Sequence, residues 1–265
     1  MKWVFNELLL TKYRVDYYYS EESGLLQTES PYWLKEAYEN PIADTDTGLV
    51  RRNLTNQRRL ETVLTAHFKG EGKFLDIGGG YGLLTRLLRD IGFDAYSTDA
   101  YCQNLFAKAF EPSLGFRATA LLAFEVFEHV ENPLEFVKSA FERYGCRNIV
   151  FSTLPFHQKL PNKDWWYYSF ETGQHITFYQ PRSLQILAQT LGCHYFSIHP
   201  DLHLISEQPV STINRILFQN RTFFKLHSQI TRYLRRKRSL TWKDNKTIKS
   251  QLRDRLKPAG DIAVL

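Results

Sequence analysis

The stretch Phe74-Leu-Asp-Ile-Gly-Gly-Gly-Tyr-Gly82 determines the predicted fold, because a short apolar run passes directly into four closely spaced glycines. Such a run is typical of a buried parallel strand that ends in a tight loop. The next residues carry leucines at helical spacing, and Gly92 then fits the left-handed position that ends a helix. The segment therefore predicts a strand, a glycine loop and a helix, in that order.

Around this unit, strands and helices alternate as far as about Ile205. Helices are expected over 49–68, over 183–191 and from Asn132, whose side chain caps the helix, with Pro133 in the first helical position. Further strands are expected over 95–98, 120–126, 148–153, 194–198 and 202–205. This alternation predicts an α/β fold with a doubly wound sheet, whose ligands bind at the carboxyl ends of the strands.

The composition is that of a globular protein, with 265 residues of which 43% are hydrophobic and 23% are charged. Collagen-like and disordered classes are therefore excluded. Cys102, Cys146 and Cys193 are too scattered for a disulfide framework or a metal site, which favours a reducing compartment. Neither a membrane span nor a secretory signal is expected, so we predict a cytoplasmic location.

The net charge of +6 conceals an asymmetry. Between Asn214 and Lys257, 14 basic residues stand against two acidic ones, which leaves 20 basic and 26 acidic residues elsewhere. This tail, with its run from Arg232 to Arg238, fits a solvated helix, a peripheral anchor to anionic lipid at the inner membrane surface, or a nucleic-acid contact. Removal of residues 231–265 is expected to leave folding nearly intact. The predicted organisation is an aromatic-rich extension over 1–48, a central domain over 49–208 and a basic helical tail over 209–265.

The glycine loop indicates the kind of ligand. A dinucleotide fingerprint needs glycine where Leu83 stands, and a phosphate-binding loop needs a Gly-Lys-Ser/Thr ending, which is absent. Asp99, at the end of the next strand, suits the two hydroxyls of a ribose, whereas Asp76 beside the loop favours a cationic ligand. A sulfonium cofactor with an ammonium group and a ribose fits both acids.

Together with Tyr96-Ser-Thr-Asp99 and Ala123-Phe-Glu-Val-Phe-Glu-His-Val130, this loop resembles the class I S-adenosylmethionine-dependent methyltransferases. The resemblance covers about residues 49–206. It implies a Rossmann-like sheet of seven mostly parallel strands with helices on both faces, and S-adenosyl-L-methionine as the cofactor. Arg52 is a further candidate, either for the cofactor's carboxylate or as a solvated helix arginine. The other expected cofactor-binding residues are Asp76, Gly78, Gly79, Gly80, Gly82, Asp99, Phe124 and Glu125.

A narrower resemblance is to bacterial methyltransferases encoded among polysaccharide and glycosyl-transfer genes. It rests on segments 27–38, 46–53 and 173–179. Members of that group often carry a cysteine-pair zinc module just before the first segment, where this chain has Ser20 and Ser23. Serine hydroxyls do not replace thiolates as zinc ligands, so no metal site is predicted.

Catalysis of methyl transfer requires alignment and, for a hydroxyl acceptor, a base. His129 is the first candidate for the base or for a substrate ligand, with Glu128 to orient it; the alternative is that both only pack at a helix start. His175 is the rival. It lies in an aromatic-rich insertion over 155–180, which predicts a lid over the substrate, a second small core or a dimer contact.

The favoured function is therefore O-methylation of a saccharide or related small molecule. An RNA methyltransferase that grips nucleic acid with the tail is one alternative, although the Asn/Asp-Pro-Pro-aromatic motif of amino-group nucleic-acid methylases is absent where Phe124-Glu-Val-Phe stands. A non-catalytic cofactor-binding or assembly protein is the other. No sequence pattern indicates the acceptor atom or the oligomeric state.

Overall fold

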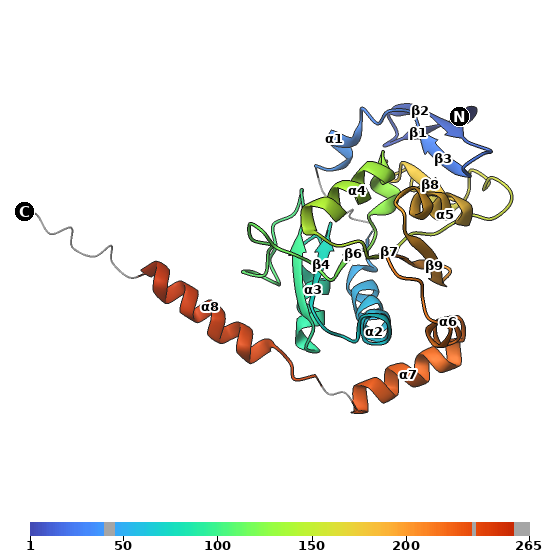
Figure 1. Ribbon diagram of the computed structural model, residues 1–265. Helices are drawn as coiled ribbons and strands as arrows, with labels where there is room; N and C mark the ends of the chain where they lie inside the picture. The colour runs from blue at the N-terminus through green and yellow to red at the C-terminus, as the bar shows by residue number, and fades with distance from the viewer. Residues whose placement is uncertain (40–45, 235–236, 257–265) are drawn as a thin grey trace, which may run out of the picture.

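The computed structural model of the chain describes residues 1–39, 46–234 and 237–256. Pro41 and the run 44–48 predict a turn or loop before the 49–68 helix, and most of it lies outside these ranges, as do Arg235 and Arg236 of the basic run. The centre of the molecule is a sheet with the strand order β5-β4-β6-β7-β10-β9 (Figure 1). Its strands are β4 (Lys73–Ile77), β5 (Asp94–Thr98), β6 (Ala120–Ala123), β7 (Ile149–Ser152), β9 (His194–His199) and β10 (Leu202–Ser206).

The four strands β5, β4, β6 and β7 are parallel, and β10 runs antiparallel to both β7 and β9. Among the described residues this sheet has six strands, so the expectation of seven is not confirmed. The connection from β5 to β6 contains Pro112 and Gly115 and forms turns and loops instead of a strand. Strand β6 also ends at Ala123, three residues earlier than expected, because the backbone of Glu125 takes a left-handed conformation.

Helices cover both faces of the sheet, as predicted (Figure 1). The alternation of side chains along each strand separates the two cores, so that Leu75 packs on one face and Phe74 on the other. On the Leu75 face lie α4 (Pro133–Tyr144) and α5 (Pro181–Thr190). On the Phe74 face lie α2 (Leu49–Phe68), α3 (Leu83–Asp90), α6 (Thr212–Gln219) and α7 (Arg221–Leu234).

The predicted helix ends are confirmed where local chemistry determines them. Helix α2 has the predicted bounds, and the Asn132 side chain accepts a hydrogen bond from the Glu135 amide (3.1 Å) at the start of α4. Gly92 follows α3 with φ +92°, a conformation that favours glycine.

A second, antiparallel sheet has the order β1-β2-β3-β8 and lies at the upper end of the molecule in Figure 1. It consists of β1 (Lys2–Leu9), β2 (Tyr13–Tyr19), β3 (Leu25–Thr28) and β8 (Thr177–Tyr179), and the short helix α1 (Leu34–Ala37) follows β3. Ser20 and Ser23, the places of the absent cysteine pair, lie in the β2–β3 turn and are joined by a hydrogen bond (3.2 Å).

The expected extension and the aromatic insertion thus form one unit. Trp33, Tyr17, Tyr168 and Phe178 are buried in a shared third core. This confirms the alternative of a second small core for 155–180. Whether the segment also covers a substrate stays a prediction.

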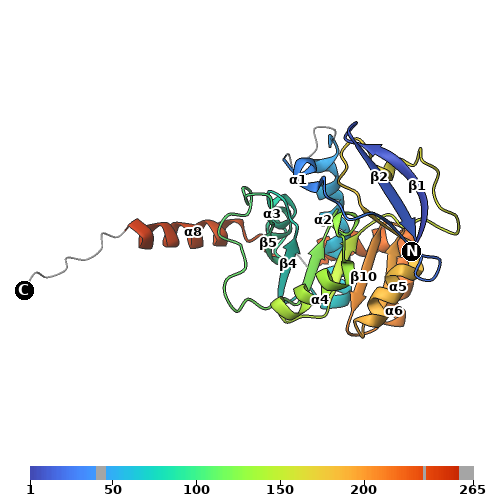
Figure 2. The same ribbon diagram turned by 90° about the horizontal axis from the view of Figure 1, so that it is seen from above.

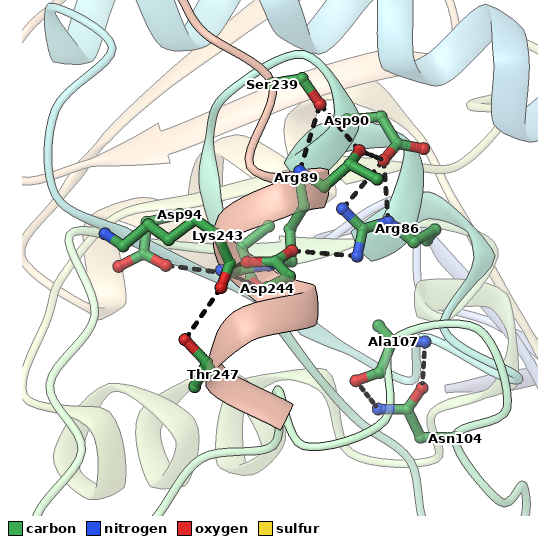
Figure 3. A network of polar contacts seen from close by, with 12 residues as sticks. Arg86, Arg89, Asp90, Asp94, Asn104, Ala107, Ser239, Lys243, Asp244 and Thr247 are labelled. Carbon is green, nitrogen blue, oxygen red and sulfur yellow. Dashed lines mark hydrogen bonds and ion pairs between the residues drawn. The ribbon is translucent and has the colours of Figure 1, made fainter. Parts of the chain in front are cut away.

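The basic tail is helical where it is described, and it packs on the body. Phe218 and Phe224 are buried in the core of the Phe74 face. Asp244 of α8 (Thr241–Leu256) is 2% exposed and accepts two hydrogen bonds, of 2.8 and 2.7 Å, from Arg89 of α3 (Figure 3). The contacts of Asp244 with Arg89 argue against the expectation that residues 231–265 are dispensable for folding. Beyond them, α8 extends away from the sheet (Figures 1 and 2). No helix within the described residues is long and apolar enough to cross a membrane.

Candidate functional site

The glycine loop lies between β4 and α3, at the carboxyl end of the sheet. Gly80 has φ +55°, and a Cβ atom built on it meets no atom within 4 Å, so this backbone faces open space. Gly82 is the N-cap of α3 with φ +80°, and a Cβ there would lie 2.2 Å from Oδ1 of Asn104. The loop therefore needs glycine at both positions and leaves its backbone accessible at Gly80.

Asp99 holds this loop in place. One carboxylate oxygen accepts a hydrogen bond from the Gly80 amide (2.8 Å), and the other accepts from the amides of Tyr101 (2.7 Å) and Cys102 (2.8 Å). The acid that the sequence assigned to a ribose is thus also the group that joins the loop to the end of β5.

Asp76 is buried at the end of β4, with 2% of its surface exposed, and its Oδ2 has no hydrogen-bond partner among the described residues. Burial, and then the neighbouring Asp99, raise the pKa of Asp76 to about 8. A Cβ atom on Gly79 would lie 2.8 Å from this oxygen, so the absent side chain of Gly79 makes room beside it. A buried acceptor without a donor beside an open loop fits a ligand that brings a cationic donor.

The residues that follow β6 differ in their placement. Phe124 is 8% exposed and packs in the Phe74-face core, while Glu125 is exposed with φ +56°. Glu125 accepts a hydrogen bond from Ser152 (2.8 Å), and its carboxylate lies 3.5 Å from Arg52. Arg52 also forms a two-bond ion pair with Asp46 (2.8 and 2.6 Å), so its guanidinium already faces two acids.

The three catalytic candidates lie together. One ligating atom each of Glu128, His129 and His175 falls within 4.8 Å of the others, and the two imidazole rings are 4.8 Å apart. Backbone pairing explains this placement, because the amide of Ile176 donates to the carbonyl of Glu128 (2.8 Å). His129 Nδ1 bonds to the carbonyl of Gln174 (2.9 Å).

Burial determines the charge state of this cluster. It raises the pKa of Glu128, which is 0% exposed, and the Glu125 carboxylate adds to the effect. It lowers the pKa of His129 to about 3 and that of His175 to about 4. Both imidazoles are therefore neutral at pH 7, but such low pKa values make either ring a weak base on its own.

Sequence reasoning missed three tyrosines around this cluster. Tyr38 stacks on Tyr101 with ring centroids 4.6 Å apart, and its ring lies 6.1 Å from that of His129. The Tyr167 hydroxyl accepts a hydrogen bond from the Leu154 amide (3.1 Å) and shares one with the Thr153 hydroxyl (3.3 Å), and its ring centroid lies 4.8 Å from that of His175. The only sequence signal for Tyr101 was its place two residues after Asp99, and Tyr38 reaches the site through the fold of the N-terminal unit.

Comparison with known proteins identifies the family of the chain. The family described as "Methyltransferase domain" matches residues 50–198, which is more than half of the chain. The chain belongs to this family. The membership confirms the expected class of enzyme, a methyltransferase. No curated protein matches the chain.

Several solved methyltransferases are similar in structure at low sequence identity. A Burkholderia thailandensis 1,6-didemethyltoxoflavin-N1-methyltransferase, solved with its acceptor and S-adenosylhomocysteine, is 11% identical with a TM-score of 0.48, over 77% of this chain and 97% of that one. The Synechocystis magnesium protoporphyrin IX methyltransferase, solved with S-adenosylhomocysteine, is 12% identical with a TM-score of 0.41, over 66% and 94%. A Planctomyces limnophilus O-methyltransferase in complex with apigenin is 13% identical with a TM-score of 0.44, over 66% and 65%.

Proposed function

We propose that this chain transfers a methyl group from S-adenosyl-L-methionine to a hydroxyl oxygen of a saccharide or related small molecule. The observation that carries the proposal is the buried, unpartnered Oδ2 of Asp76 beside the open backbone of Gly80. When bound, the cofactor supplies an electrophilic methyl group on a positively charged sulfur.

On the donor side, the chain's own groups match the polar ends of this cofactor. Asp76 offers its free oxygen to the ammonium group, and the open backbone at Gly80 leaves room for the amino-acid portion. Asp99 stands at the end of β5, where a ribose would share its carboxylate with the backbone amides that it already accepts from. Arg52 would bind the cofactor's carboxylate only by exchanging one of its two acidic partners.

On the acceptor side, Glu128, His129 and His175 form the polar cluster that receives the hydroxyl. Tyr38 links this cluster to the donor side, because its ring stacks on that of Tyr101 (4.6 Å) and lies 6.1 Å from that of His129. The exposed rings of Tyr101 (65%) and Trp166 (72%) offer apolar faces of the kind that pack against sugars or flat ring systems. The narrower resemblance to polysaccharide-associated methyltransferases favours the saccharide.

Two glycines allow a matched test of the donor side. Gly80 and Gly115 both have positive φ and open space at the Cβ position, so alanine costs each about 1 kcal/mol of backbone strain. We expect Gly80→Ala to weaken binding of S-adenosylhomocysteine at least tenfold in a calorimetric titration, because its methyl group occupies the approach to the loop. Gly115→Ala should bind as the wild type does. If the two variants bind S-adenosylhomocysteine with equal affinity, the glycine loop is not part of the cofactor site.

The acceptor class is tested by methyl transfer from radiolabelled cofactor to a panel of sugar nucleotides, oligosaccharides, phenols and RNA. We expect incorporation into a saccharide. Incorporation into RNA alone, lost when the tail's basic residues are neutralised, would favour the nucleic-acid function instead. Cofactor binding without turnover on any acceptor would favour a non-catalytic protein.

A further inference from the structure

Glu128, His129 and His175 have oxygen and nitrogen lone pairs that accept no hydrogen bond in the folded chain, as far as it is described. Neither carboxylate oxygen of Glu128 forms a hydrogen bond of normal geometry within the described residues, although the side chain is fully buried. A buried carboxylate without a partner costs several kcal/mol, so such groups in native proteins call for a bound ion, a ligand or a catalytic role.

The two imidazoles are held in one orientation. His129 Nδ1 donates to the carbonyl of Gln174 (2.9 Å), and His175 Nδ1 donates to the carbonyl of Tyr167 (2.6 Å). With the proton on Nδ1, Nε2 of each ring keeps its lone pair. Metal-bound histidines show this same arrangement, in which the second nitrogen donates to a carbonyl that fixes the ring.

We propose that Glu128, His129 and His175 bind one divalent transition-metal cation of the class Mn²⁺, Fe²⁺, Co²⁺ or Zn²⁺. Two imidazole nitrogens with one carboxylate form a mixed donor set that suits these ions, whereas Mg²⁺ and Ca²⁺ prefer oxygen alone. Bonds of about 2.0–2.2 Å place two donors on one ion at most about 4.4 Å apart. The present separations of up to 4.8 Å exceed this limit, and a tetrahedral ion, whose donors lie about 3.4 Å apart, would draw them together by roughly 1 Å.

The surroundings of the cluster are consistent with a cation. Glu125 adds a second negative charge close enough to raise the pKa of Glu128, and its own carboxylate is held by Ser152 and Arg52. The left-handed φ of +56° at Glu125 is uncommon outside glycine, and such strain concentrates at functional sites. We count Glu125 as a neighbouring charge and assign three ligands only.

The role of the cation rests on the proposed function. Its charge lowers the pKa of a hydroxyl bound beside it, which the weakly basic His129 and His175 cannot do alone. The hydroxyl proton passes to solvent water and the oxygen lone pair forms the new bond to the methyl carbon. The carbon–sulfur bond breaks with its electron pair on sulfur, so the sulfonium becomes a neutral thioether.

The test measures Mn²⁺ binding to the full chain after removal of metals with a chelator, by the loss of the free-ion signal in electron paramagnetic resonance. We expect one Mn²⁺ per chain and displacement by Zn²⁺, which binds nitrogen donors more tightly. Glu128→Gln and His175→Ala should each weaken Mn²⁺ binding at least tenfold. The matched control is His157→Ala, since His157 is exposed and outside the cluster.

Each variant is also titrated with S-adenosylhomocysteine, which reports folding and separates the two proposals. Cofactor binding without Mn²⁺ or Zn²⁺ binding by the wild type would overturn the metal site and leave the proposed function standing. Metal binding without cofactor binding would overturn the proposed function and leave the metal site standing. Unchanged Mn²⁺ affinity in a folded Glu128→Gln variant would overturn the ligand assignment. If the Glu128→Gln variant does not fold, Mn²⁺ binding to the His175→Gln variant provides the same test.

Discussion

Asp244 and Glu128 are buried to nearly the same degree, with 2% and 0% of their surfaces exposed, but they differ in their partners. Asp244 receives Arg89 through two hydrogen bonds (2.8 and 2.7 Å) and lies 3.0 Å from Arg86, within a network that joins α8 to α3 (Figure 3). Glu128 has no such partner within the described residues. Burial by itself therefore does not distinguish a structural acid from a functional one. The hydrogen bonds and ion pairs that the acid forms do distinguish them.

The physical reason lies in the cost of desolvation. A buried charge with well-placed counter-charges recovers this cost within the fold, and it destabilises the protein strongly when one partner is removed. A buried acid without partners forms no stabilising contacts within the fold, so its replacement removes none. Only a bound ligand offsets the desolvation free energy of such an acid. The predictions below use this contrast.

The largest effect is expected from Asp244→Ala. This change leaves Arg89, which is 3% exposed, with the Asp94 carboxylate as its remaining ion-pair partner among the described residues. Removal of one partner of a buried pair costs about 3–5 kcal/mol. Denaturant unfolding should show this loss, whereas Asp164→Ala, at an exposed acid, should stay within about 0.5 kcal/mol of the wild type. A loss below about 1 kcal/mol for Asp244→Ala would mean that the network does not anchor α8.

Asp76 is a third buried acid, and its pKa predicts a pH dependence of stability. The folded value of about 8 lies above the ordinary 3.8, so the folded chain retains a proton that the unfolded chain releases. This stabilisation is fully present below about pH 4 and is lost as the pH rises to 8. Relative to Asp76→Asn, the wild type should lose about 2 kcal/mol between pH 6 and pH 8. The measurement is denaturant unfolding of both proteins at each pH, and parallel curves would contradict the raised pKa.

The smallest effect on stability is expected from Glu128→Gln. The amide has nearly the shape of the acid, and neither oxygen of Glu128 forms a hydrogen bond within the described residues that the change would break. Arg52, the positive charge that acts on Glu128, keeps Asp46 and Glu125 as ion-pair partners. The free energy of unfolding without added metal should change by less than about 1 kcal/mol. Methyl transfer should fall about 10²–10⁴-fold if the cluster acts on the acceptor. A destabilisation similar to that of Asp244→Ala would show that Glu128 stabilises the fold as Asp244 does, and would contradict the difference between the two acids.

Sequence predicts well those features that depend on neighbouring residues. The bounds of α2, the Asn132 cap and the glycine loop follow from local spacing and backbone preference. The seventh strand was predicted from the resemblance, and the segment between β5 and β6 lacks the residues to form it. Asp244 could not be placed from sequence, because its partner Arg89 lies 155 residues away and a single acid in a basic helix carries no signal.

The site shows the same limit. The sequence identified Glu128, His129 and His175 one by one but treated the two histidines as rivals, since only the fold brings them to a ring distance of 4.8 Å. No metal site is predicted from the sequence, because Ser20 and Ser23 stand where the similar methyltransferases carry a cysteine pair. The pattern Glu128-His129 with a distant third ligand becomes recognisable only when the pairing of Ile176 with Glu128 is known.

The pairing of β3 with β8 has a consequence for the order of folding during synthesis. Roughly 150 residues separate the two strands, which corresponds to about 8–30 s of translation at typical rates. Until β8 leaves the ribosome, the first three strands present an open edge and lack much of the aromatic core that covers them. The segment that brings β8 also brings His175. Synthesis thus completes the N-terminal unit and the catalytic cluster in the same late event, before β9 and β10 of the central sheet are made, so a nascent chain cannot hold a finished cluster on an unfinished N-terminal unit.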